Sequence, residues 1–230
     1  MGCTSCTSKG GCESRKGEER QLLSHVLPLL YPGRKWGEPD DEARFRGGVG
    51  EREGRRLARQ ASEALRAPTY FRPGAEDEPC DYLYALCVGR PPGLVELRDR
   101  PELEVPDGDT IEERYLRASL SSMTRVAAVQ ELVFELAREG DVYVVRERPR
   151  DGVYDPILLK RTQALIELLV ASDVTYLDFG LLTKPVSRYA EGFDDAGYEE
   201  RFGGPPATVN YLFYPQPATA ITTSWIPCAR

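Results

Sequence analysis

The sequence is short of histidine, of long apolar runs and of the residue sets that mark common catalytic sites. His25 is the single histidine among 230 residues, so a Ser-His-Asp or Cys-His mechanism has little support. No window approaches the roughly 18 consecutive apolar residues that a membrane helix needs. Residues Met1 to Arg20 are polar and lack the apolar stretch of a secretory signal. We therefore expect a cytoplasmic protein without a membrane span, whose thiols stay reduced.

An excess of basic charge is also missing. The formal net charge is −7, and it is unevenly spread: residues 1–66 hold 13 Lys and Arg against 10 Asp and Glu, so the remainder carries −10. An acidic body argues against general nucleic-acid binding, which depends on neutralising phosphates. The basic N-terminal third would offset a negatively charged thiolate cluster or face an acidic partner.

The apolar spacing outlines a series of helices and strands. Helical spacing predicts helices over residues 18–30, 51–66, 110–137 and 156–169. The third begins with a capping-box spacing at Thr110 and Glu113, and the fourth begins with Asp155 and Pro156. Strand-like runs cover residues 69–72, 81–88, 93–98, 141–147 and 173–180. Two further runs at 207–213 and 218–226 are expected to form an antiparallel pair at a sheet edge.

Strand, helix and strand over residues 141–180 follow the pattern of a βαβ unit. The expected fold class is therefore α/β: a mixed sheet with at least one βαβ unit, flanking helices and an N-terminal Cys-rich arm. We divide the chain into a Cys-rich metal-binding arm at 1–16, a helical segment at 17–66 and an α/β body at 67–230.

The opening MGCTSCTSKGGC holds Cys3, Cys6 and Cys12 in a C-x2-C-x5-C spacing. Two intervening residues let a pair of sulfurs face one ion, and the glycines before Cys12 let the backbone return a third. Because clusters and tetrahedral zinc usually take four ligands, a fourth is needed. Cys80 and Cys228 are the internal candidates, since both are expected to be accessible. Cys87 lies among apolar strand residues and is expected in the core.

The metal interpretation has alternatives. The arm can be a flexible tail whose cysteines bind nothing, or a disulfide or redox switch. Zinc is the second choice to an iron–sulfur cluster, because zinc knuckles usually have two C-x2-C pairs and the second is missing. His25 is better explained as a packed imidazole than as a ligand. A partner protein or a small molecule can also supply the fourth ligand.

Three other patterns are better explained by structure than by chemistry. Asp178-Phe-Gly spells the metal-binding tripeptide of kinases, but the other kinase motifs are missing. Gly48, Gly50 and Gly54 lead into a helix without a preceding hydrophobic strand, so a turn is favoured over a phosphate site. Asp194 or Asp195 is expected to cap a short helix that ends at Gly203.

The leading hypothesis is an accessory or electron-transfer protein that binds an iron–sulfur cluster or zinc and docks onto a larger redox enzyme, or helps to assemble it. The second is a small α/β enzyme with a site at the carboxyl ends of its parallel strands and a structural arm. The third is an interaction protein that caps an assembly. The sequence assigns no catalytic residue.

Overall fold

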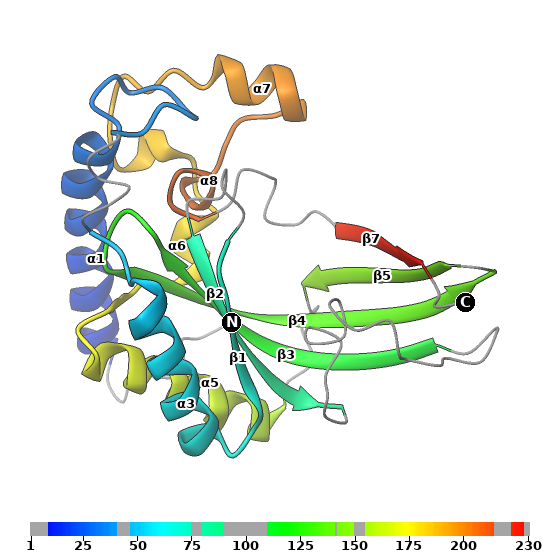
Figure 1. Ribbon diagram of the computed structural model, residues 1–230. Helices are drawn as coiled ribbons and strands as arrows, with labels where there is room; N and C mark the ends of the chain where they lie inside the picture. The colour runs from blue at the N-terminus through cyan, green and yellow to red at the C-terminus, as the bar shows by residue number, and fades with distance from the viewer. Residues whose placement is uncertain are drawn as a thin grey trace.

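The computed structural model describes residues 9–40, 47–74, 80–89, 110–140, 142–149, 155–213 and 222–227, and in these residues the strands form one curled sheet (Figure 1). The strands are β1 (Thr69–Arg72), β2 (Cys80–Val88), β3 (Thr110–Ser121), β4 (Val126–Glu139), β5 (Val142–Pro149), β6 (Thr175–Tyr176) and β7 (Thr222–Pro227). Their order is β1-β2-β3-β4-β5-β7, with every neighbouring pair antiparallel. The short β6 adds to β4 in parallel, so the sheet is mixed.

Helices cover both faces of the sheet (Figure 1). They are α1 (Lys9–Leu30), α3 (Glu51–Leu65), α5 (Pro156–Ala171), α6 (Phe179–Leu182), a 3-10 turn (Val186–Arg188), α7 (Ala196–Phe202) and α8 (Thr208–Leu212). Helices α3 and α5 pack on one face. Helices α1, α6 and α8 pack on the other face. The expected mixed α/β sheet with flanking helices is therefore confirmed in outline.

The face beneath α3 and α5 has a core of Leu, Val and Ala only, and we call it the aliphatic face. Helix α3 supplies Leu57, Ala61 and Leu65 at helical spacing, and all three are buried. Leu165 of α5 is also fully buried there. Gly54 allows α3 to approach β1, because an added Cβ would lie 2.1 Å from the ring of Phe71. Full burial of such side chains contributes about 1.5–3 kcal/mol each.

The opposite face is rich in rings, and we call it the aromatic face. Tyr84, Tyr115 and Phe134 stand on neighbouring strands with their ring centroids 5.0–6.2 Å apart, in edge-to-face arrangements. Tyr31, just after α1, packs edge-on against Tyr211 of α8 at 5.0 Å. The hydroxyl of Tyr31 donates to the carbonyl oxygen of Tyr211 at 2.6 Å. The start of the chain is thus joined to residues far along it.

The helix predicted over 110–137 is wrong, because these residues form the hairpin of β3 and β4. Each strand is covered on both faces: Tyr115 points to the aromatic face, and its neighbour Leu116 points to the aliphatic face. A strand buried on both sides loses the alternation of polar and apolar residues, and its Glu, Arg, Leu and Ala are good helix formers. Tertiary packing overrides that local preference.

The strand, helix and strand of the predicted βαβ unit are present as β5, α5 and β6, but the two strands do not pair in parallel as such a unit requires. Asp155 caps α5 by accepting hydrogen bonds from the amides of Ile157 and Leu158. However, β5 runs antiparallel to β4 whereas β6 runs parallel to it, so β5 and β6 are neither neighbours nor parallel. The parallel part of the sheet is the two-residue pairing of β6 with β4.

The tail differs from the expected edge pair. Residues 208–212 form helix α8, whose buried side chains pack on the aromatic face instead of forming a strand. Strand β7 does lie at the sheet edge, but its partner is β5. The strand expected at 93–98 lies outside the described residues. The predictions for α3, β1 and β2 are confirmed, and α1 contains the predicted 18–30 helix and begins earlier, at Lys9.

Candidate functional site

Of the six cysteines, three lie among the described residues: Cys12 in α1, and Cys80 and Cys87 in β2. Cys3, Cys6 and Cys228 lie outside the described residues. Cys12 belongs to the first turns of α1. Cys80 is buried, which corrects the expectation that it is accessible, and its thiol donates to the carbonyl oxygen of Phe213 at 2.8 Å.

Cys87 lies on the other side of the sheet from Cys80. Cys80 packs on the aromatic face, and Cys87 packs partly buried against the aliphatic face, as their odd separation along the strand predicts. Burial raises the pKa of the Cys87 thiol, so it behaves as a small core residue and not as a reactive thiolate. His25 is exposed on α1, which contradicts the expected packed imidazole.

The described residues do not contain a cluster of three or more His, Cys, Asp or Glu side chains that could hold a metal ion. Within that part of the chain, no helix is long and apolar enough to cross a membrane. Three of the five proposed thiolate ligands lie outside it.

The remaining sequence patterns have structural explanations. Asp178 caps α6 by accepting from the amide of Gly180 at 2.8 Å, so its tripeptide is a helix start. A Cβ on Gly48 would lie 2.3 Å from the carbonyl oxygen of Ser122, so this glycine permits close backbone packing against the β3–β4 turn. Helix α7 lies between Asp195 and a left-handed Gly203, as predicted. The side chain of Asp195 makes no cap hydrogen bond, whereas the carboxylate of Asp194 accepts from the amide of Ala196 at 3.1 Å.

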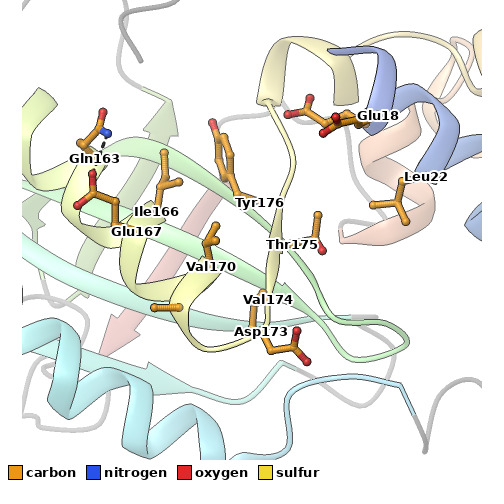
Figure 2. A pocket seen from close by; sticks show the side chains of 12 residues that line it. Glu18, Leu22, Gln163, Ile166, Glu167, Val170, Asp173, Val174, Thr175 and Tyr176 are labelled. Carbon is orange, nitrogen blue, oxygen red and sulfur yellow. Dashed lines mark hydrogen bonds between the residues drawn. The ribbon is translucent and has the colours of Figure 1, made fainter. Parts of the chain in front are cut away.

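The described residues also form an open groove that the sequence did not indicate, between helices α1 and α5 (Figure 2). Its volume is about 980 Å³. Helix α1 contributes Glu18, Glu19 and Leu22 to its lining, and residues 173–176 run between the two helices. Helix α5 contributes Gln163, Ile166, Glu167, Val170 and Ala171. The groove thus crosses the sheet edge at β6, where helices of opposite faces meet.

The lining is amphipathic and carries charge of one sign. Leu22, Ile166, Val170 and Val174 form its apolar part, and Val170 is 54% exposed. Carboxylates stand on both sides: Glu18 and Glu19 come from α1, and Glu167 and Asp173 come from α5 and the turn after it. No Lys or Arg is among the described lining residues. Such a surface suits an amphipathic ligand with positive charges.

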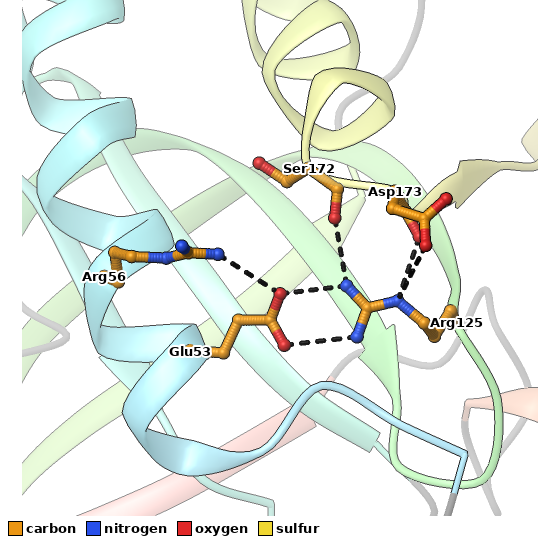
Figure 3. A network of polar contacts seen from close by, with 5 residues as sticks. All are labelled: Glu53, Arg56, Arg125, Ser172 and Asp173. Carbon is orange, nitrogen blue, oxygen red and sulfur yellow. Dashed lines mark hydrogen bonds and ion pairs between the residues drawn. The ribbon is translucent and has the colours of Figure 1, made fainter.

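Arg125 fixes the turn that forms one end of the groove (Figure 3). Its guanidinium donates to the backbone carbonyls of Ser172 and Asp173, both at 2.9 Å. It also donates to both carboxylate oxygens of Glu53 on α3, at 2.9 and 3.1 Å. These hydrogen bonds lower the pKa of Glu53 and raise that of Arg125. Asp173 adopts φ 61°, a left-handed conformation that needs such support in a residue other than glycine.

A second polar cluster lies on the aromatic face. Arg117 of β3 donates to Glu147 of β5 at 2.5 Å and to Gln130 of β4 at 3.0 Å. Its guanidinium lies 5.5 Å from the centre of the Tyr82 ring on β2. Each side chain of the Arg117–Glu147 pair is only 11% exposed. The cluster joins four adjacent strands, β2 to β5.

No family model, curated protein or solved structure matches the chain. Sequence reasoning missed the groove because its two walls are about 150 residues apart in the chain and no local pattern joins them. One signal was available: Val170 and Ile166 are apolar on α5, beside Glu167 and away from Leu165 and Leu169, which fill the core.

Proposed function

We propose that the protein is a metal-binding accessory protein that docks onto a larger redox enzyme or helps to assemble it. Cys3, Cys6 and Cys12 would bind the metal, as an iron–sulfur cluster or as zinc. Cys228, a partner or a small molecule would complete the ligand set. Cys80 is the weaker candidate, because binding would break its hydrogen bond to Phe213 and open a packed core.

The observation that carries the proposal is the continuity of α1. This one helix contains Cys12 near its start and supplies Glu18 and Leu22 to the groove. Six residues of helix correspond to a rise of about 9 Å along the axis. A metal bound by the cysteine motif would therefore lie close to the groove, and a protein seated there would approach it. Electron transfer and metal delivery both require such proximity.

The rest of α1 is anchored independently of the cysteines. Leu23, Leu27 and Leu30 are buried on the aromatic face. Loss of a metal at the start of the helix should therefore leave the fold in place, which makes the proposal testable by removing the ligands.

The test is anaerobic purification with absorption spectroscopy and elemental analysis. An iron–sulfur cluster should absorb at about 400 nm through thiolate-to-iron charge transfer, and zinc should be colourless but measurable. Replacing Cys3, Cys6 and Cys12 by Ser together should remove the metal without changing the far-UV circular dichroism spectrum. Cys87→Ser is the matched control and should keep the metal. Metal-free wild-type protein from an iron- and zinc-replete preparation would overturn the proposal.

A further inference from the structure

We propose that the groove between α1 and α5 binds a basic, amphipathic peptide segment of a partner protein. The inference deepens the proposed function, because the segment would belong to the protein onto which this chain docks. The described lining of the groove contains none of the proposed cysteine ligands, so its binding can be measured whether or not the cysteine motif holds metal.

The apolar part of the lining calls for an apolar ligand surface. Val170 is 54% exposed although it lies in the last turns of a helix whose other side is buried in the core. With Leu22 from α1 and Ile166 one turn earlier on α5, it forms an apolar strip between the two helices. Covering this apolar surface would favour association, because it removes the surface from contact with water.

The carboxylates on the two sides determine the charge of the ligand. Glu167 and Asp173 stand on the α5 side, and Glu18 stands on the α1 side (Figure 2). The side chain of Asp173 is 98% exposed, and Nε of Arg125 lies 3.9 Å from its carboxylate. Lys or Arg residues flanking an apolar face would meet carboxylates on both sides, whereas an acidic segment or a nucleic acid would be repelled.

The mixture of apolar and charged residues distinguishes a peptide from a small polycation. A polyamine would use the carboxylates but would leave Leu22, Ile166 and Val170 in contact with water or with its charged groups. A segment with apolar residues at helical or alternating spacing and basic residues beside them satisfies both parts of the lining.

The groove is also organised before binding. Arg125 holds the carbonyls of Ser172 and Asp173, so the turn that carries Asp173 and leads into residues 174–176 is fixed (Figure 3). A wall that is already ordered loses little conformational entropy when a ligand arrives.

The experiment is a fluorescence titration of the full chain with three labelled or competing probes. The first is a peptide of about 18 residues made of Leu and Lys, with Leu on one helical face. The second has the same composition in scrambled order, and the third is spermine. We expect saturable binding of the first peptide, weaker binding of the scrambled one, and loss of affinity as salt shortens the screening length from about 10 Å at 0.1 M.

Two variants test the two parts of the groove. Glu167→Gln with Asp173→Asn removes two charges but keeps the side-chain shapes, and Asn tolerates the left-handed backbone; we expect about a 5-fold loss of affinity. Val170→Asp places a charge in the apolar strip, and we expect a loss of about 10-fold or more. Glu199→Gln with Glu200→Gln on α7, outside the groove, is the matched control and should bind as the wild type does.

Three results would overturn the inference: no saturable binding up to about 1 mM peptide, equal binding of the ordered and scrambled peptides, or equal losses in the groove and α7 variants. Spermine displacing the peptide with unchanged affinity in Val170→Asp would assign the groove to a small polycation instead. The titration is repeated on the Cys3, Cys6 and Cys12 triple Ser variant. Unchanged peptide binding there, with the metal lost, separates the groove from the metal site.

Discussion

The two faces of the sheet bury different kinds of side chain. The buried cluster beneath α3 and α5 is made of Leu, Val and Ala. In the chain, α3 directly precedes β1, and α5 lies between β5 and β6. The cluster beneath α1, α6 and α8 contains eight Tyr and Phe residues, and buried polar groups such as Glu113 and Glu147 stand on the same side of the sheet.

This difference in composition indicates which face depends on the precise placement of its side chains. Aliphatic side chains pack without directional requirements, so volume and pattern are sufficient. Buried polar groups of the aromatic face depend on directed hydrogen bonds: the hydroxyl of Tyr115 donates to Glu113 at 2.5 Å, and Arg117 donates to Glu147 at 2.5 Å. Burial raises the pKa of Tyr84, which stays a neutral phenol beside that ion pair. This face should tolerate substitution less well.

The largest effect is expected where one member of the buried ion pair is removed. Arg117→Met should lower the free energy of unfolding by about 3 kcal/mol or more, because Glu147 would remain as a buried and unpaired charge. Replacing both residues by Met should recover most of that loss. Urea unfolding measures both. Arg146→Met is the control, since its pair with Glu139 is exposed and contributes about 0.5 kcal/mol or less. An equal cost in the two single variants would show that burial adds nothing to the cost of breaking the Arg117–Glu147 pair.

On the aliphatic face, Leu165→Ala should lower the free energy of unfolding by about 3 kcal/mol, through lost burial and a cavity. Ile157→Ala on the same helix is the matched control, because that side chain is 66% exposed, and its effect should be within about 0.5 kcal/mol. Differential scanning calorimetry gives both values. If Leu165→Ala lowers the free energy of unfolding only slightly, neighbouring side chains must move to fill the cavity, and the aliphatic face is less rigidly packed than we expect.

A smaller, pH-dependent effect on the free energy of unfolding is expected at the Glu53–Arg125 pair, which joins α3 to the turn between β3 and β4. The pKa of Glu53 is lowered in the folded state, chiefly by the hydrogen bonds from Arg125. The pair therefore stabilises the fold above the unfolded pKa of about 4.3, and this stabilisation is lost as the pH falls through the lower, folded value. Glu53→Gln should cost about 1 kcal/mol at pH 7 and much less at the acidic end of the titration.

Urea unfolding of Glu53→Gln and wild type across that pH range measures the difference. Glu51→Gln, on the same helix and paired with the exposed Arg55, is the control and should change stability little. A cost at Glu53 that does not depend on pH would show that the carboxylate acts through packing alone.

The sequence predicted the elements whose signals are local. Asp155 and Pro156 mark the start of α5, Asp195 and Gly203 enclose α7, and the spacing of Leu57, Ala61 and Leu65 gives α3. In each case the residues that decide the structure lie within a few turns of one another. Strand β2 also follows from its composition and from the opposite placement of Cys80 and Cys87.

The rest depends on residues that are far apart. The sequence of β3 and β4 favours a helix, because cover on both faces hides the alternation of polar and apolar residues that marks a strand. The groove exists only because Glu18 and Val170 are brought together by packing on opposite faces. No spacing within either helix encodes that meeting.

The hydrogen bond between Tyr31 and Tyr211 has a consequence for the order in which the chain folds. The hydroxyl of Tyr31 and the indole of Trp36 donate to carbonyls 180 and 174 residues further along, and β1 to β5 lie between these points in the chain. During folding the hairpins and α5 can assemble from neighbouring segments, but the contacts of Tyr31 and Trp36, directly after α1, form only once α8 is in place. We expect the amides of α1 to become protected last in pulse-labelled hydrogen exchange, and protection before that of β3 and β4 would refute this order.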